Sequence, residues 1–567
     1  MIFMIRLAHR FALAAVVLPG MIVPAAVAQS APASVAVTAV RNFPPASYRA
    51  DGQNWAIAED NRGILYFGNS SGVLEFDGTR WRLIELPGKR GVYALGKSGD
   101  GRILVGSEGE VGWLAPDPAG SMVYVSKADG LPDAFRSAGD RMIQILDTPN
   151  GQVFLSDHWL FIRAAGGALS SYHSDDHFLQ SAWFQGILYV LDSARGLLRL
   201  DSGVLNDIAG GARIRGVAML TTDSGLLIPS YNDGLIRYSP ETPNHWQVLN
   251  SGGWSTTDGS DVTSGVVLNK NLMALGTAKH GVILINADGK VLQRVGAAGG
   301  LTDVNVYGIY YDNRSDLWLA SDNGLSLVGL NLPRAAAAVP FHSWVRSVVG
   351  TRDEHLLFGG TYFAEPNSVQ QLEQGKTQKL VFPYDYNAFR FDYSANGLEA
   401  SGQMQFQTYM EGVDKGWSSW STRSEREFTS LSHATWVFRV RSRKADGVPS
   451  SEGVYEFTIR PAWYDTWWFA VFQVLFVLAL LILPSHTPHK GLQDALTTFA
   501  VIVPIIYLGD ALLGFVEHYY STEVVFIKML ISASVAALLD PIQNYLKKHV
   551  HHRNTNHAAR RARSAQQ

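Results

Sequence analysis

Short apolar segments, separated by turns rich in Gly, Asp and Asn, recur through residues 51–333. In one copy, Trp55–Ala58 leads to the turn Asp60–Gly63, then to Leu65–Gly68 and to a segment that begins with glycine, Gly72–Phe76. Segments this short, with apolar residues at alternate positions and turn residues between them, predict β-strands and not helices.

The same pattern occurs seven times, at intervals of roughly 34 to 49 residues, which is the length of a four-stranded propeller blade. The other copies include Val92–Leu95 with Val111–Leu114, Met142–Ile145 with Trp159–Phe161, Gly196–Leu198, Gly234–Ile236, Gly281–Ile283, and Val306–Ile309 with Gly324–Leu327. A single blade cannot bury both of its faces, so the copies must stack around an axis. We therefore expect a mainly β protein that begins with a seven-bladed β-propeller over residues 29–334.

A second set of short alternating segments follows the propeller over residues 335–462. They are Phe389–Tyr393, Phe406–Gly412, Trp417–Trp420, Phe428–Leu431, Trp436–Arg441 and Tyr455–Ile459. Period-two alternation bounded by turns over about 120 residues predicts an Ig-like β-sandwich.

The last part of the chain has a different pattern, with long apolar stretches that predict transmembrane helices within residues 463–540. The expected spans are residues 467–483, 495–516 and 519–539. Trp463, Tyr464, Trp467 and Trp468 precede or begin the first span, where aromatic side chains favour the membrane–water interface. We expect these four residues to form an interfacial belt.

Two ionisable residues, Asp510 and Lys528, lie within the second and third expected spans. Charges at membrane depth are costly and usually paired. The pair is either a signalling or proton-linked element, or a structural contact between helices in which Lys528 extends toward the interface.

Signals at the two ends of the chain set the expected localisation. Arg6 and Arg10 precede an apolar stretch and the small residues Ala26–Ala28, which together predict a signal peptide over residues 1–28. Lys and Arg dominate the tail at residues 541–567, which places that tail in the cytoplasm. We expect a multi-pass protein of the bacterial inner membrane with its large N-terminal part in the periplasm.

Composition narrows the possible functions. The chain has 567 residues, no cysteine and a formal net charge of −3. Disulfides and thiolate metal sites are therefore excluded. The balanced charge gives no reason to expect a nucleic-acid partner.

Two motifs that suggest chemistry are better explained by structure. Gly68–Gly72 fits the G-x-S-x-G nucleophile pattern, but that motif requires a following helix, and Val73–Phe76 is expected to be a strand. His549, His551, His552 and His557 lie in the basic tail, where contact with anionic lipid is expected instead of metal binding. We expect no catalytic residue, no metal and no cofactor.

Gly300–Leu301–Thr302 followed by Val306–Leu327 resembles the repeat of two-component regulator propellers. The segments of residues 335–462, together with Pro461–Phe469, resemble the three-tyrosine domain that joins such propellers to the membrane. The chain departs from that pattern at Thr408, where the tyrosine has moved to Tyr409 or been lost, and at Trp436, which replaces a later tyrosine. The resemblance covers about 420 residues and implies the sensor half of a bacterial hybrid histidine kinase.

The expected function is that of a membrane-anchored periplasmic sensor which binds an extracytoplasmic ligand at one end of the propeller. A saccharide is one candidate ligand, because aromatic propeller faces suit sugar rings. No kinase-like segment follows the third span, so we expect a separate kinase or other transmitter as a partner, and a homodimer remains open. The alternatives are a membrane-tethered propeller enzyme acting on polysaccharide, and a receptor remnant without output.

Overall fold

A computed structural model describes residues 35–482 except 215, 231–232, 243–244, 250–260, 313–315, 333–339, 375–379, 397–402 and 445–446. It also describes residues 498–499 and 502–503. The predicted signal peptide, the second and third predicted spans apart from those two short pairs, Asp510, Lys528 and the basic tail lie outside the described residues.

Residues 37–330 form seven four-stranded antiparallel sheets, here called blades 1 to 7. Blade 1 contains β2 (Asn54–Glu59), β3 (Leu65–Asn69), β4 (Gly72–Phe76) and β5 (Trp81–Ile84); blade 2 contains β6 (Val92–Lys97), β7 (Ile103–Ser107), β8 (Glu110–Pro116) and β9 (Met122–Ser126). Blade 3 contains β10 (Met142–Thr148), β11 (Gly151–Ser156), β12 (Trp159–Arg163) and β13 (Leu169–His173); blade 4 contains β14 (Phe178–Phe184), β15 (Ile187–Asp192), β16 (Gly196–Asp201) and β17 (Val204–Asp207).

Blade 5 contains β18 (Leu220–Thr222), β19 (Gly225–Ser230), β20 (Gly234–Tyr238) and β21 (Trp246–Leu249); blade 6 contains β22 (Val262–Asn269), β23 (Leu272–Thr277), β24 (Val282–Asn286) and β25 (Val291–Val295). Blade 7 contains β26 (Val306–Tyr311), β27 (Asp316–Ser321), β28 (Gly324–Leu330) and β1 (Val37–Phe43). Short helices join some of them: α1 (Pro45–Tyr48), α2 (Asp133–Ala138), η1 (Gly211–Arg213) and η2 (Ala297–Gly299).

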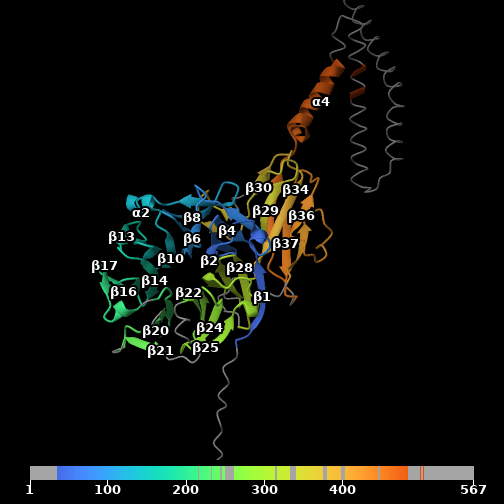
Figure 1. Ribbon diagram of the computed structural model, residues 1–567. Coiled ribbons are helices and arrows are strands. Elements are labelled where there is room, and N and C mark those ends of the chain that lie inside the picture. Colours follow the sequence, from blue (N-terminus) through green and yellow to red (C-terminus); the bar gives the residue numbers. More distant parts are fainter. Residues whose placement is uncertain are drawn as a thin grey trace, which may run out of the picture.

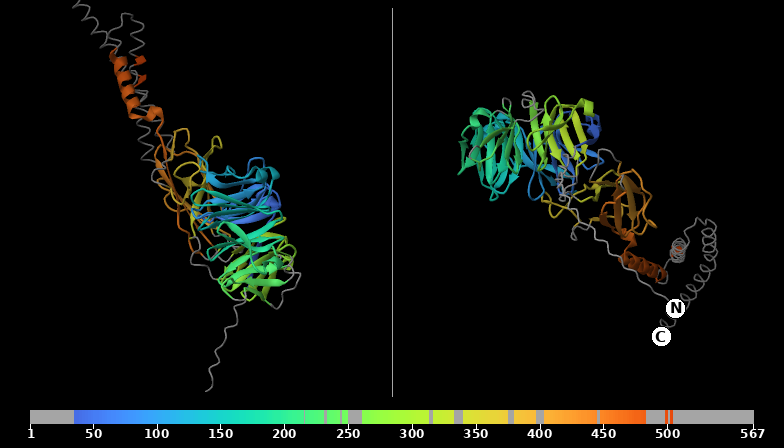
Figure 2. Two further views of the ribbon diagram at one scale, coloured as in Figure 1. Left: turned by 90° about the vertical axis from the view of Figure 1, so that its left-hand side faces the viewer. Right: turned by 90° about the horizontal axis from the view of Figure 1, so that it is seen from below.

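The seven blades close into a ring (Figures 1 and 2). The first strand of each blade contacts the first strand of the next, from β2 round to β26 and back to β2. Blade 7 takes its outer strand from the N-terminal side of the chain, where Val40 pairs with Val328. The prediction of a mainly β fold built from seven blades is confirmed, while the closing strand β1 was not predicted.

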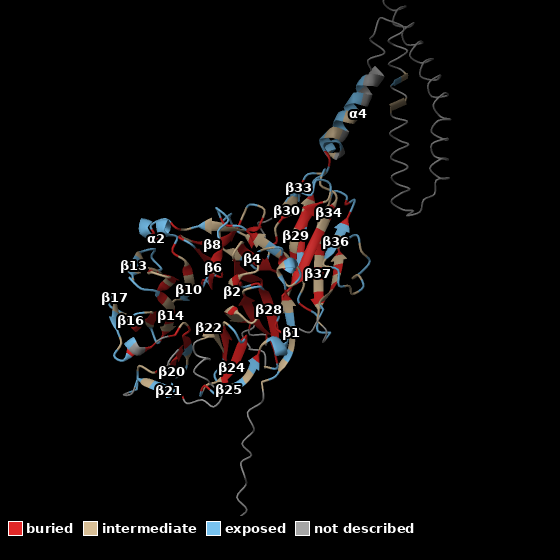
Figure 3. Cartoon of the chain, viewed as in Figure 1, coloured by how far each residue is buried: buried red, intermediate tan, exposed pale blue. Residues whose placement is uncertain are grey.

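Glycines permit two close backbone approaches, one within blade 1 and one between blades. Gly72, at the start of β4, has a φ of +140°, and a Cβ there would lie 2.5 Å from the carbonyl oxygen of Ile84. Gly308 lies where blade 7 meets blade 1, and a Cβ there would lie 2.6 Å from the carbonyl oxygen of Trp55. Apolar side chains fill the spaces between blades, so the buried residues form layers around the ring (Figure 3).

The predicted turn Asp60–Gly63 joins β2 to β3. The backbone N–H of Gly63 donates to the carbonyl oxygen of Asp60 over 3.1 Å, and Asp60 Oδ1 accepts from the backbone N–H of Arg62 over 2.8 Å. The segment Gly68–Gly72 joins the strands β3 and β4, as expected for a turn that does not form a nucleophile elbow.

After the propeller, residues 343–459 form two further four-stranded sheets and a two-stranded one. The junction sheet contains, in order, β30 (Leu356–Phe358), β29 (Ser343–Gly350), β34 (Phe389–Ala395) and β36 (Glu425–Phe428). The distal sheet contains β33 (Leu380–Phe382), β38 (Gly453–Ile459), β37 (Thr435–Arg443) and β35 (Gln405–Met410). The small sheet pairs β31 (Tyr362–Phe363) with β32 (Gln370–Gln371).

The junction and distal sheets share one hydrophobic core, in which Phe391 of β34 stacks on Phe438 of β37 with ring centroids 4.4 Å apart. We call this part the two-sheet domain. Every buried residue of its core cluster lies between Val345 and Ile459. Trp436 packs against the same core, and Thr408 is buried. The Ig-like topology remains a prediction.

Two strand predictions in this part were wrong. Trp417–Trp420 is not a strand; Trp417 lies against Tyr409, with ring centroids 5.8 Å apart, and beneath the guanidinium of Arg441. The strand expected over Phe428–Leu431 is β36, which ends at Phe428, and Leu431 is instead buried in the core beyond the strand end. In both places a large apolar side chain packs against the domain without its backbone pairing in a sheet. In the sequence, such a residue cannot be distinguished from a strand residue.

The chain leaves the two-sheet domain through η3 (Trp463–Asp465) and enters α4 (Trp467–Ile482), which points away from both domains (Figure 1). Helix α4 covers the first predicted span and has 16 residues. Among the described residues, no helix combines the length and the apolar character needed to cross a membrane.

Candidate functional site

A β-bulge occurs at the second residue of the inner strand in six of the blades. In β2, for example, Asn54 pairs with Asn69 and Ala56 with Gly68, so Trp55 is skipped by the ladder. The skipped residues are Trp55, Tyr93, Ile143, Leu179, Thr263 and Tyr307. A bulge re-aims the side chain of its extra residue, and bulges are common beside functional sites.

Three neighbouring blades carry an aromatic residue at this position, and their rings form a continuous row. Tyr307 of blade 7 stacks on Trp55 of blade 1, with centroids 4.4 Å apart and planes at 25°. Trp55 lies against Tyr93 of blade 2, with centroids 5.3 Å apart and planes at 56°. All three side chains are half-buried. We call these residues the aromatic row.

Each ring of the row donates a hydrogen bond to the turn between the second and third strands of its own blade. The indole N–H of Trp55 donates to Ser70 Oγ over 3.2 Å. The hydroxyl of Tyr93 donates to Glu108 Oε1 over 2.9 Å, and that of Tyr307 to Asp322 Oδ1 over 3.4 Å. Donor and acceptor are 15 residues apart in every case. The repeat therefore fixes both the position and the orientation of the rings at one end of the propeller.

Charged groups surround the row. The guanidinium of Arg141, which precedes β10 of blade 3, lies 5.8 Å from the ring centroid of Trp55 and 5.6 Å from that of Tyr93. Burial, together with the hydrogen bond to Glu108, raises the pKa of Tyr93 to about 12. Burial and the nearby charge of Asp322 also raise the pKa of Tyr307. Both hydroxyls are therefore protonated donors near neutral pH.

The row combines aromatic ring surface with two carboxylates that can accept more hydrogen bonds than those described above. A carboxylate offers about four lone-pair sites, and the bonds from tyrosine occupy one oxygen each on Glu108 and Asp322. Aromatic rings offer apolar area together with a polar edge. This end of the propeller is therefore suited to a ligand that has both C–H surface and hydroxyl groups.

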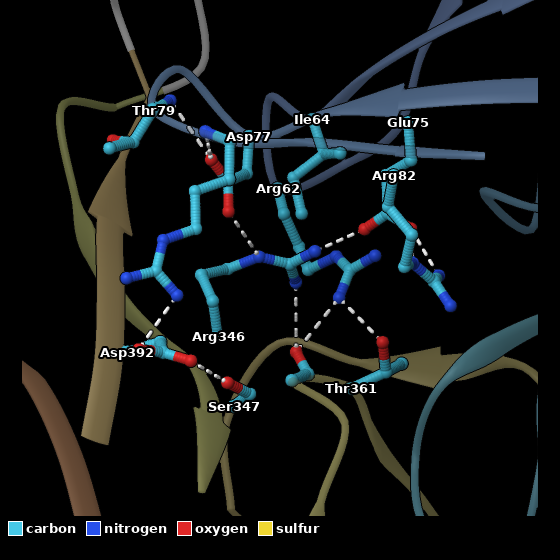
Figure 4. A network of polar contacts seen from close by, with 12 residues as sticks. Arg62, Ile64, Glu75, Asp77, Thr79, Arg82, Arg346, Ser347, Thr361 and Asp392 are labelled. Carbon is cyan, nitrogen blue, oxygen red and sulfur yellow. Dashed lines mark hydrogen bonds and ion pairs between the residues drawn. The ribbon is translucent and has the colours of Figure 1, made fainter. Parts of the chain in front are cut away.

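A second polar arrangement joins blade 1 to the two-sheet domain (Figure 4). Arg62 is almost fully buried, and its guanidinium donates to Asp60 Oδ2 over 2.8 and 2.9 Å. It also donates to Thr361 Oγ1 over 2.8 Å and to the carbonyl oxygen of Gly360 over 3.1 Å. Burial opposes the charge of Arg62, but Asp60 outweighs this effect and the pKa is raised.

Glu75 and Asp77 of blade 1 bind a second arginine, Arg346 of β29. Arg346 donates from Nη2 to Glu75 Oε1 and from Nε to Asp77 Oδ2, the latter over 3.2 Å. Arg82 donates to the other oxygen of Glu75. Burial alone would raise the pKa of Glu75, but the charges of Arg82, Arg346 and Arg62 lower it to about 2. The carboxylate is therefore ionised at any ordinary pH.

Arg80 makes a third set of ion pairs between blade 1 and the two-sheet domain. Its Nη1 lies 2.7 Å from Asp392 Oδ1, and its Nη2 lies 3.0 Å from Glu425 Oε2. Backbone bonds reinforce these ion pairs; the N–H of Gly359, for instance, donates to the carbonyl oxygen of Ala119 over 2.7 Å. We call the contacts made by Arg62, Arg80 and Arg346 the junction network. Because they are short and mostly buried, movement of blade 1 is expected to reach the junction sheet.

The predicted interfacial belt lies around η3 and the start of α4. Trp467 is 79% exposed and Trp468 50%, and Trp463 and Tyr464 are also exposed. The ring of Tyr464 lies 6.4 Å from that of Tyr384 in the two-sheet domain. The role of this belt remains a prediction, and Asp510 and Lys528 lie outside the described residues. Within the described part of the chain, no group of three or more His, Asp or Glu side chains is placed to hold a metal ion.

The aromatic row and the junction network were not predicted as sites. The sequence gives one signal for the row, which is that Tyr93 and Tyr307 occupy the same place in their repeats. The bulge that aligns Trp55 with them is a property of strand register. The cross-domain contacts of the junction network join residues about 270 to 345 positions apart, and no local sequence pattern predicts such contacts.

No family model matches the chain, and no curated protein matches it either. Among solved structures, it is similar to the extracellular domain of BT4673, described as a hybrid two-component system of B. thetaiotaomicron, with 14% identity and a TM-score of 0.42. That match covers 76% of this chain, which spans only 60% of the other.

The corresponding domain of BT3049 from the same organism shows 12% identity over 74% of this chain and 80% of its own, with a TM-score of 0.21. YCF48 from Cyanidioschyzon merolae shows 12% identity over 51% and 98%, with a TM-score of 0.39. Scores below 0.5 carry no argument about function, so the propeller is established here by its own sheets and ring closure.

Proposed function

We propose that this chain is a receptor-like protein whose propeller binds an extracytoplasmic saccharide at the aromatic row. The observation that carries the proposal is the placement of aromatic residues at the bulge position of three neighbouring blades, with each ring held by its own turn. Ring faces would contact the C–H surface of a sugar, and Glu108 and Asp322 would accept from its hydroxyls.

The route from this site to the membrane-proximal part follows the contacts already described. Trp55 belongs to β2 of blade 1, and the same blade supplies Glu75, Asp77 and Arg80 to the junction. A ligand can shift such a system only by binding two arrangements with different affinity. The proposal therefore requires that ligand contact alters blade 1 relative to blade 2 or blade 7.

Anchoring in the inner membrane is part of the proposal. It is supported by the exposed apolar side chains of α4, which include Val471, Phe472, Leu475 and Phe476. Exposed apolar surface of this extent marks contact with a partner or a lipid phase. With the belt at its start, α4 would enter the bilayer from the two-sheet domain.

The test measures saccharide binding by the full chain in detergent micelles, using calorimetry with maltotriose, cellotriose, xylotriose and mannotriose. We expect at least one of these neutral trisaccharides to bind. Trp55→Ala and Tyr307→Ala should each weaken that binding by at least about tenfold, equivalent to about 1.4 kcal/mol. Tyr93→Phe keeps the ring and should have a smaller effect.

Trp113→Ala is the matched control, because Trp113 is a half-buried aromatic residue beneath Lys127 on β8, the third strand of blade 2, and is not part of the aromatic row. It should bind as the wild type does. The proposal fails if none of the four sugars binds, or if Trp55→Ala and Tyr307→Ala fold normally and bind with unchanged affinity.

A further inference from the structure

A broad hollow of about 1080 Å³ lies where blade 1 meets the two-sheet domain, apart from the aromatic row. Its lining contains four arginines (Arg80, Arg390, Arg423 and Arg426), two glutamates and six serine or threonine residues. Tyr393 and Phe406 are its only aromatic lining residues in the described part of the chain. A site so rich in cations and hydroxyls is unsuited to an apolar ligand.

Two of the four arginines are already engaged. Arg426 donates to both oxygens of Asp414, over 2.7 and 2.9 Å, and lies over the ring of Phe428. Arg80 is paired with Asp392 and Glu425 in the junction network. These two shape the hollow and add positive charge.

The other two arginines retain donors. The side chain of Arg390 is 40% exposed. Among the described residues, the only carboxylate within 4 Å of its guanidinium is that of Asp392, 3.7 Å from Nε, and Arg80 and Ser347 already bind that carboxylate. Arg423 is exposed, and among the described residues its guanidinium has no hydrogen-bond or ion-pair partner. Each guanidinium therefore presents a fork of N–H groups that matches the two oxygens of a carboxylate or sulfate.

We propose that this hollow is a second binding site, which takes an acidic saccharide through Arg390 and Arg423. The serine and threonine hydroxyls of residues 418–424 would bond the sugar hydroxyls. The volume is larger than a lone phosphate or sulfate requires and slightly exceeds the range for pockets that hold larger organic ligands, about 300–1,000 Å³. This site lies outside the aromatic row and does not depend on the function proposed for it.

Of the two glutamates that line the hollow, Glu425 is paired with Arg80, and Glu427 opposes the proposed ligand. Glu427 lies directly opposite Arg390 in the antiparallel register of β36 and β34. Cross-strand neighbours share one face of a sheet, so the charge of Glu427 lowers the attraction that Arg390 exerts on an anion. Removal of this carboxylate should therefore strengthen binding of the acidic saccharide. The proposal can thus be tested by a gain of affinity as well as by a loss.

The experiment titrates the full chain in detergent micelles with trigalacturonate by calorimetry at low salt, because screening weakens such pairs. Maltotriose and inorganic sulfate are the comparison ligands. We expect trigalacturonate to bind more tightly than sulfate. Arg390→Gln with Arg423→Gln should weaken it by at least about tenfold, and Glu427→Gln should strengthen it. Binding of maltotriose should not change in any of these variants.

Arg352→Gln is the matched control, since Arg352 is an exposed arginine of the same domain that does not line the hollow. Near-UV circular dichroism checks that each variant is folded. The proposal is wrong if trigalacturonate does not bind, if it binds no better than sulfate, or if the folded double variant retains wild-type affinity. Loss of trigalacturonate binding in Trp55→Ala but not in the arginine variants would assign the ligand to the aromatic row and also overturn it.

Discussion

Arg62 of blade 1 donates to Thr361 Oγ1 across 2.8 Å, although the two residues are 299 positions apart in the chain. The bond is buried, and it joins the propeller to the two-sheet domain beside the pair of Glu75 and Arg346. A junction built from buried charges depends on every partner being present, because an unpaired buried charge is far more costly than a lost surface contact.

Glu75→Gln should therefore destabilise the protein strongly. Glu75 and Arg346 have side chains only 2% and 9% exposed, and the variant leaves Arg346 without its main counter-charge. Breaking a buried pair in this way costs about 3–5 kcal/mol. Denaturant unfolding of the full chain in micelles, followed by tryptophan fluorescence, measures the loss. Glu85→Gln, an exposed neighbour, should change the free energy of unfolding by less than about 0.5 kcal/mol.

The same carboxylate predicts how stability depends on pH. The pKa of Glu75 is lowered from 4.5 to about 2, so its contribution is complete above pH 4.5 and is lost as the pH falls toward 2. The melting temperatures of wild type and Glu75→Gln should therefore differ most near pH 6 and converge as the pH approaches 2. A difference that stays constant over this range would contradict the role of the ionised carboxylate.

Whether a feature of this structure could be predicted from the sequence depends on how far apart in the chain the interacting residues lie. The strands of blade 1 and the glycine at the start of β4 follow from alternation and turn residues, which are local signals. Pairing of Val40 with Val328 is not local, so β1 was missed. The bulge at Trp55 depends on how β2 meets β3, and the pairing of Arg346 with Asp77 depends on how two domains dock. The periodicity of apolar residues contains no information about strand register or about how two domains dock.

Gly308→Ala should weaken closure of the ring between blades 7 and 1. A Cβ at this position would lie 2.6 Å from the carbonyl oxygen of Trp55, and a backbone atom cannot move aside as a flexible side chain can. Overpacking of this kind costs about 1–3 kcal/mol. Gly166→Ala is the control, because an added Cβ there meets no atom within 4 Å. Equal melting temperatures for the two variants would show that the inner strands can separate without penalty.

The four belt residues should place the start of α4 at the membrane interface. In vesicles that contain lipids brominated near the headgroup, quenching of tryptophan fluorescence reports proximity to that region. Trp467→Phe with Trp468→Phe should lose much of the quenchable emission, while Trp113→Phe should leave it unchanged. If the double variant is quenched as strongly as the wild type, these residues do not lie at the interface.

The junction network should hold the two domains together even when the chain between them is cut. A specific protease site inserted between Pro333 and Pro340 allows cleavage of the folded protein in micelles, and the fragments should co-elute in gel filtration at physiological salt. Arg62, Asp77 and Arg346 lie on opposite sides of the cut, and buried ion pairs are screened much less than exposed ones. Arg62→Ala with Arg346→Ala should let the cleaved fragments separate, whereas Arg352→Gln should not. Fragments that separate in the otherwise unaltered sequence would mean that the linker, and not the network, keeps blade 1 on the junction sheet, and a signal could not then pass between them through these contacts.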